Sequence, residues 1–228
     1  MLYMDWTYLL IIPGLLLGLW AQSRVNSAYR EYSQVPTRLG QPASAMVQDL
    51  LRRNGNNVVT IGRVSGNLTD HYNPADETLK LSDGVYGSSS VAALGIAAHE
   101  AGHAMQKMEG YAPLSLRSAA VPMVNFGSML STPLFFVGLI MAWQPLVYAG
   151  IALFSLSTIF ALITLPVEFD ASRRAVRMLT EGGYVTGEEE RGVRKVLNAA
   201  ALTYVAAAVT SLLTLLRLLL IANRGRRR

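Results

Sequence analysis

The sequence predicts a mainly α-helical membrane protein with about four transmembrane helices and one small α+β region. Hydrophobic residues make up 51% of the 228 positions and charged residues only 15%, well below the roughly 25% charged residues of a typical soluble domain. The hydrophobic residues gather in runs long enough to cross a bilayer, whereas residues 24–117 are polar and carry strand and amphipathic-helix patterns.

The composition limits both the chemistry and the partners. The chain has no cysteine, so disulfides and thiolate ligands are excluded, and any metal must be held by His, Asp or Glu. A net charge of +5 could indicate nucleic acid. However, many arginines lie beside apolar runs and at the C-terminus, as membrane-flanking residues do. We therefore expect a lipid bilayer and no nucleic acid as partner.

The first apolar run, residues 8–22, has Tyr3, Trp6, Tyr8 and Trp20 near its ends. With its flanks it approaches the roughly 20 residues that span a bilayer. A cleaved signal peptide is the alternative, but no Lys or Arg precedes the run and no A-x-A-like site follows it. Residues 1–22 are therefore predicted to be a retained transmembrane anchor.

Residues 23–118 are predicted to form the α+β region. Residues 43–53 have an apolar face at helical spacing, with Pro42 before and Gly55 after them. Three strands are expected at residues 58–64, 67–72 and 78–81, with turn residues at 73–76 between the last two. Ser88 to Ser90 can cap a helix that runs to about Met108.

Three further segments follow. Two apolar runs, residues 121–142 and 146–167, are separated only by Trp143-Gln144-Pro145, which predicts a transmembrane hairpin over 119–167. Residues 168–196 are predicted as helices leaving the membrane, broken at Gly182-Gly183 and restarted by a capping box at Thr186 and Glu189. Residues 197–228 are predicted as a fourth span with a basic tail.

The stretch His99-Glu100-Ala101-Gly102-His103 reads H-E-x-x-H. On a helix, residues four apart lie on one face, so His99 and His103 can bind one zinc ion. Glu100 then flanks the open coordination position and can act as general base toward a zinc-activated water. Two surface histidines on a helix are the alternative. The pattern favours a zincin-like catalytic domain with one Zn²⁺ per chain.

A catalytic zinc usually has three protein ligands and one water. The third histidine, His71, precedes the motif, and Glu168 follows the predicted hairpin. Because the hairpin crosses the membrane twice, it returns Glu168 to the side of the motif. We favour Glu168 as the third ligand, the alternative being an interfacial carboxylate paired with Arg173 or Arg174.

Several neighbours are candidates for supporting roles. Asp170 and Ser172 lie close to Glu168, and either could accept the outer ring N–H of a zinc-bound histidine. Asp70, His71 and Tyr72 could line a substrate cleft, with His71 or Tyr72 donating to a developing oxyanion. An ordinary structural role in the hairpin is the alternative for these three residues.

The segments LTDHYNP, LKLSDGVYGSSSVAALGIAAHEAGHA and LPVEFDASRRA together resemble the YugP-type membrane zinc metallopeptidases of bacteria. The last segment is also similar to HtpX-like gluzincins. The resemblance implies a multi-pass protein of the bacterial cell membrane, with His99, His103 and Glu168 as zinc ligands and Glu100 as general base. The carboxylate expected four residues after the ligand Glu is Ser172 here, and an Asp stands at 170 instead.

Two functions remain open. The first is a zinc endopeptidase that cuts peptides or proteins, membrane-protein segments included, with the substrate added to the strand edge near residues 68–72. The second is a membrane scaffold or interaction protein with a structural or vestigial zinc, which His71 as a fourth ligand would favour. Glu100 argues for the enzyme, because a structural site needs no general base.

The polar stretches that flank the motif carry 15 of the 20 Lys and Arg residues, which favours a cytoplasmic-facing site.

Overall fold

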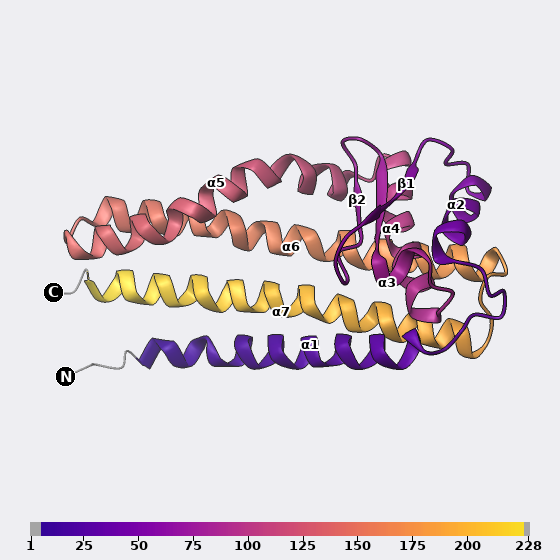
Figure 1. The fold of residues 1–228 in the computed structure, drawn as a ribbon. Coiled ribbons are helices and arrows are strands. Elements are labelled where there is room, and N and C mark those ends of the chain that lie inside the picture. Colours follow the sequence, from indigo (N-terminus) through magenta and orange to yellow (C-terminus); the bar gives the residue numbers. More distant parts are fainter. Residues whose placement is uncertain (1–5, 226–228) are drawn as a thin grey trace. The chain divides into compact units, whose positions relative to one another are not determined.

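The computed structural model describes residues 6–225, with side chains up to Asn223. Tyr3 and the end of the basic tail lie outside the described residues. The chain is mainly helical with one small sheet, as predicted (Figure 1). Its elements are, in order, η1 (Trp6–Leu10), α1 (Ile12–Ser33), α2 (Ala43–Arg53), β1 (Thr60–Val64), β2 (His71–Asn73), β3 (Thr78–Ser82), α3 (Asp83–Tyr86), α4 (Val91–Met108), α5 (Ala112–Ile140), α6 (Gln144–Glu181) and α7 (Glu188–Gly225).

Among the described residues, four helical segments are long and apolar enough to cross a membrane: Trp6–Ser33, Ala112–Ile140, Gln144–Glu181 and Glu188–Asn223. This agrees with the predicted number of spans. The described chain divides into two compact units. One comprises residues up to 21, 116–165 and from 203 onward, and the other comprises 22–115 and 166–202.

In the first unit, α5 and α6 form a tight antiparallel hairpin. Gly150 of α6 lies so close to α5 that an added Cβ would be 2.6 Å from the backbone nitrogen of Phe135. Small residues allow such close helix packing in apolar surroundings. The connection is residues 141–143, two positions earlier than predicted, because α5 ends at Ile140 and α6 begins at Gln144. Pro145 lies in the first turn of α6, where its missing N–H is not needed.

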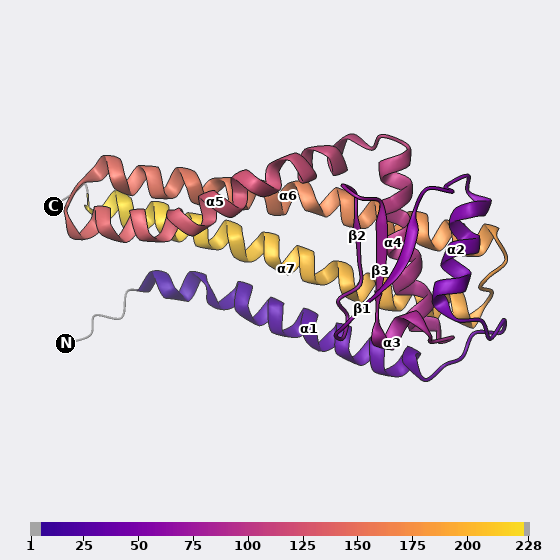
Figure 2. The ribbon, with the colours of Figure 1, turned by 45° about the horizontal axis from the view of Figure 1, so that its top comes forward.

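The second unit contains the sheet, whose strand order is β1-β3-β2 (Figure 2). Strand β3 pairs parallel with β1 and antiparallel with β2. Leu79 and Leu81 of β3 are fully buried. Strand β2 is therefore an edge strand with one side unpaired within the sheet.

The strand expected at residues 67–72 is wrong in its position, because β2 covers only His71–Asn73. Leu68 has a φ of 55°, which is incompatible with an extended strand. Asp70 accepts hydrogen bonds from the backbone and hydroxyl of Ser82, at 2.8 and 2.9 Å. These two contacts hold the segment before β2 as a loop.

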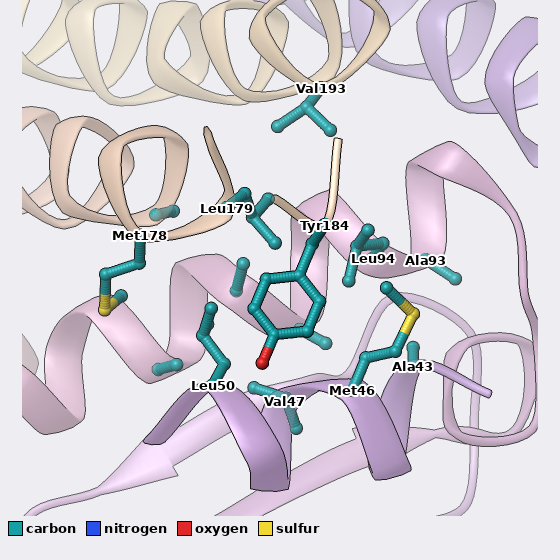
Figure 3. Packing of buried hydrophobic residues seen from close by; sticks show 14 of the residues in the cluster. Ala43, Met46, Val47, Leu50, Ala93, Leu94, Met178, Leu179, Tyr184 and Val193 are labelled. Carbon is teal, nitrogen blue, oxygen red and sulfur yellow. The ribbon is translucent and has the colours of Figure 1, made fainter. Parts of the chain in front are cut away.

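The core of the second unit forms where the apolar face of α2 meets α4, α6 and the segment before α7 (Figure 3). Met46, Val47 and Leu50 of α2 are buried, on the face that the sequence predicted. Tyr184 lies among them, and its hydroxyl donates to Asp49 at 2.5 Å. This core packs α4 and the 166–181 part of α6 together in one compact unit.

Candidate metal centre

Helix α4 carries both histidines of the motif. Ser90 caps it, since its hydroxyl oxygen accepts a hydrogen bond from the Ala93 N–H at 3.2 Å. Alanine and glycine make up much of the helix, and most of its residues are buried. The rings of His99 and His103 lie on one face with their centroids 4.8 Å apart.

Glu168 of α6 completes a compact group of ligand atoms. Its Oε2 lies 3.1 Å from Nε2 of His99 and 3.6 Å from Nε2 of His103. The three ligand atoms all lie within 4.8 Å of one another. Tetrahedral zinc with bonds of about 2.0–2.1 Å needs ligands roughly 3.3–3.4 Å apart. The nitrogen and oxygen donors and their spacing therefore fit a zinc ion.

Glu168 reaches the histidines because α4 and α6 approach each other closely at Gly102. A Cβ on Gly102 would lie 2.4 Å from the carbonyl oxygen of Ala171, where any side chain would force the helices apart. Gly102 is inside the motif, and Ala171 is three residues beyond Glu168. The glycine thus sets the separation of the two helices that carry the candidate ligands.

The ring of His99 is held from behind by Ser172. Its Nδ1 lies 3.1 Å from the Ser172 hydroxyl, and its Nε2 faces Glu168. This is one of the two partners considered for the outer ring nitrogen. Because a hydrogen-bonded Nδ1 fixes the orientation of the imidazole, Nε2 is the nitrogen presented to a metal.

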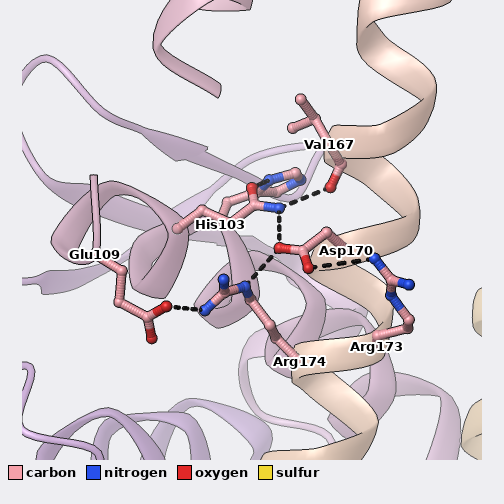
Figure 4. A network of polar contacts seen from close by, with 7 residues as sticks. His103, Glu109, Val167, Asp170, Arg173 and Arg174 are labelled. Atoms are coloured by element: carbon pink, nitrogen blue, oxygen red, sulfur yellow. Dashed lines mark hydrogen bonds and ion pairs between the residues drawn. The ribbon is translucent and has the colours of Figure 1, made fainter. Parts of the chain in front are cut away.

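The ring of His103 is held by Gln106, a residue that the sequence reasoning missed. Nδ1 of His103 lies 3.0 Å from Gln106 Oε1. The amide nitrogen of Gln106 donates to the Val167 carbonyl at 2.8 Å and to Asp170 Oδ2 at 2.9 Å (Figure 4). With its nitrogen committed to two acceptors, the amide can only accept at Oε1, so Nδ1 of His103 carries the proton and Nε2 is free for a metal.

Asp170 contacts neither histidine in the hydrogen bonds of the described residues. It accepts from Gln106 and from Arg174 Nε, the latter at 2.5 Å. Arg174 also bonds to Glu109, just beyond the end of α4, at 2.6 Å. Asp170 thus supports His103 through Gln106. Gln106 follows His103 by three positions on the same helix, and residues at this spacing are neighbours. This spacing was the signal in the sequence for a contact between the two side chains.

The carboxylates of Glu168 and Glu100 give the candidate metal centre a negative electrostatic potential. Burial lowers the pKa of His103, but Glu168 and Glu100 together raise it more, so the pKa of this imidazole lies above its ordinary value. The field that favours an imidazolium at this position also favours a divalent cation, since both are positive charges in the same place.

Glu100 is buried beside the histidines, and its Oε2 accepts a hydrogen bond from the backbone N–H of Tyr72 at 2.9 Å. Among the described residues its other oxygen, Oε1, accepts no hydrogen bond. Burial, with a smaller effect of Glu77 and Asp76, raises the pKa of the Tyr72 phenol to about 12. The Tyr72 hydroxyl therefore stays protonated and can only act as a neutral group.

The remaining candidates lie around β2. His71 is exposed, and its Nδ1 contacts the Thr69 carbonyl at 2.9 Å. It is not in the metal-compatible group that the described residues form. Asp70 is occupied with Ser82, as described above. Substrate-binding roles for Asp70, His71 and Tyr72 stay predictions.

Residues 7–223 match the model of a protein family described as "putative neutral zinc metallopeptidase". The chain belongs to this family. It is also 44% identical over 217 residues to the "Putative membrane protease YugP" of Bacillus subtilis (strain 168), an alignment that covers 95% of this chain and 96% of that protein. No solved structure matches the chain. Membership of a zinc metallopeptidase family agrees with the His99, His103 and Glu168 group, and confirms the resemblance drawn from the sequence.

Replacing Gly102 by alanine should abolish zinc binding, because the new methyl group would push α6, and with it Glu168, away from α4. Elemental analysis of the purified protein would measure this loss. Gly87→Ala is the matched control, since a Cβ at Gly87 meets nothing within 4 Å. Full zinc content in Gly102→Ala would contradict the spacing role.

Gln106→Met should lower zinc affinity by about 10- to 100-fold, because His103 loses the acceptor that fixes its tautomer. Titration against a chelator of known affinity would measure it. Gln48→Met, at an exposed position on α2, should leave the affinity unchanged. Equal affinities in the two variants would show that Gln106 does not position His103.

Proposed function

We propose that this chain is a membrane-anchored zinc-dependent endopeptidase with one zinc ion held by His99, His103 and Glu168. The proposal rests on one observation above all. Two imidazole nitrogens and a carboxylate oxygen lie within 4.8 Å of one another, and a second buried carboxylate, Glu100, is adjacent to the first histidine. Three protein ligands beside a free carboxylate is the composition of a catalytic zinc site, whereas structural sites are usually closed by four.

Bound at these residues, zinc supplies a Lewis acid that polarises the scissile carbonyl and makes water more acidic. Glu100 is the proposed general base. The Tyr72 N–H holds its Oε2 at 2.9 Å, which orients the carboxylate and leaves Oε1 to take a proton from water and later deliver it to the leaving amine. Ser172 and Gln106 keep the two imidazoles in the tautomer that offers Nε2.

The edge strand β2 is the proposed docking site for substrate. It is paired on one side only, and Tyr72 on this strand contacts Glu100 through its backbone. An extended peptide that pairs with the open side of β2 would lie beside the general base. Unfolded chains or membrane-protein segments could provide such a strand, an expectation that rests on fold-level analogy.

Residues 23–118 and 168–196 are proposed as the zincin-like catalytic part and the remainder as membrane anchor. We propose further that the site faces the cytoplasm, because the polar stretches around it carry most of the basic residues. Protease added outside intact cells should therefore leave an epitope tag inserted after Gly55 intact. Rapid loss of the tag in intact cells would reverse the orientation.

Zinc content and cleavage of an unfolded protein such as casein test the site directly. Wild type should hold one zinc, and Glu168→Ala should lose it. Glu100→Gln should keep zinc but cleave at least about 100-fold more slowly, because the general base is gone. Glu181→Ala, at an exposed position near the end of α6, is the control and should behave as wild type.

The outcomes separate the parts of the proposal. Zinc retained in Glu168→Ala would disprove the ligand set, and normal cleavage by Glu100→Gln would disprove the general base. A wild type that binds zinc but cleaves neither casein nor a broad peptide library would instead favour a scaffold with a structural ion.

A further inference from the structure

A cavity of about 470 Å³ lies between α1 and α7 in the second compact unit, lined by residues other than the proposed ligands and base. Its lining includes Ala28 of α1 and Ala199 of α7. These two small residues are buried and pack in one cluster with Val196 and Ala92. The helices are therefore held together beneath the cavity, while their longer polar side chains surround it.

Four cationic side chains and one carboxylate line the cavity: Arg24, Arg191, Arg194, Lys195 and Glu31. Lys195 bonds to both oxygens of Glu31, at 2.9 and 2.8 Å. Arg194 pairs with Glu190 at 2.7 Å, and Arg191 pairs with Glu188. Arg24 forms no hydrogen bond or ion pair with any residue that the structure describes, and acts on Glu31 only through its charge.

These cations can exchange their partners for an anionic ligand. The side chains of Arg191 and Glu188 are 68% and 84% exposed, and those of Lys195 and Glu31 are 43% and 48% exposed. Exposed ion pairs contribute little to stability. Arginine binds phosphate oxygens with two parallel N–H groups, a stronger arrangement. Arg24 needs no exchange at all.

The position of these residues along their helices indicates where the anion comes from. Arg24 is the first charged residue after residues 6–23, which contain no Lys, Arg, Asp or Glu. Lys195 is the last charged residue before residues 196–216, which also contain none. Both helices therefore place their cations directly beyond an apolar stretch, at the depth where lipid headgroups lie.

The cavity is also of mixed polarity. Ala28, Ala199 and Leu202 give it an apolar side, and the cations give it a polar one. A phosphate ester with attached hydrocarbon matches both sides, whereas inorganic phosphate matches only the second. We propose that the cavity lined by Arg24, Arg191, Arg194 and Lys195 binds the phosphate headgroup of an anionic membrane phospholipid.

Native mass spectrometry of the full chain tests this site. The protein is released from detergent after incubation with equal amounts of phosphatidylglycerol and phosphatidylcholine. Wild type should retain phosphatidylglycerol preferentially. Arg24→Gln/Arg191→Gln should lower this preference roughly 25-fold, which is about fivefold for each arginine. The matched control, Arg52→Gln/Arg177→Gln, removes two exposed arginines elsewhere and should keep the wild-type preference.

A second variant keeps every cation. Ser27→Glu adds a carboxylate to the cavity lining at an exposed position of α1, and it should also weaken phosphatidylglycerol retention. Thermal unfolding without lipid verifies that each variant is folded. If Arg24→Gln/Arg191→Gln does not fold, the lipid preference of Ser27→Glu alone tests the proposed site.

Three results would overturn the proposal. An unchanged lipid preference in both cavity variants would exclude the site. Equal losses in the cavity and control variants would show a general effect of net charge. Thermal stabilisation by inorganic phosphate or glycerol phosphate as strong as that by phosphatidylglycerol would assign the cavity to a soluble phosphate instead of a lipid.

Discussion

The close approach of α4 and α6 at Gly102 and Ala171 is the constraint on which the candidate metal centre depends. A Cβ at Gly102 would meet the Ala171 carbonyl oxygen at 2.4 Å. On α4, His99 lies about one turn before Gly102 and His103 directly follows it, and on α6 Glu168 lies about one turn before Ala171. The helix separation that glycine permits is therefore what brings a carboxylate within about 3–4 Å of two imidazoles 69 and 65 positions away in the chain.

Hydrogen bonds to the Nδ1 atoms of the two histidines then fix the orientation of the candidate ligands. Each histidine is fixed at Nδ1 by a neutral side chain, Ser172 or Gln106. Gln106 is in turn fixed by Asp170, which is neutralised by Arg174, and Arg174 reaches Glu109 at the far end of α4. The network connects α4 and α6 a second time, beyond the Gly102 contact. Neither imidazole is hydrogen-bonded to a carboxylate through Nδ1. The negative charge of the centre therefore comes mainly from Glu168 and Glu100.

The fold class, the α2 and α4 helices and the grouping of His99, His103 and Glu168 could be predicted from the sequence. Helical periodicity, the Ser90 cap and an even number of membrane crossings between His103 and Glu168 are local or topological rules. The choice between Ser172 and Asp170 could not be predicted, because it depends on the rotation of α6 about its axis. Gln106 has no signature apart from its spacing to His103. The position of β2 depends on the hydrogen bond from the Ser82 N–H to Asp70, 12 residues away in the chain. The alternation of polar and apolar residues that predicts a strand contains no information on such a contact.

The order of the ligands along the chain has a consequence for biogenesis. His99 and His103 are synthesised first, and Glu168 follows only after α5 and most of α6, two of the four candidate spans. A nascent chain that has not yet inserted this hairpin would hold only two of the three proposed metal donors. Completion of the proposed centre would therefore have to wait until the hairpin is made and inserted. A peptidase built in this order would stay inert on the ribosome and acquire its activity only in the bilayer.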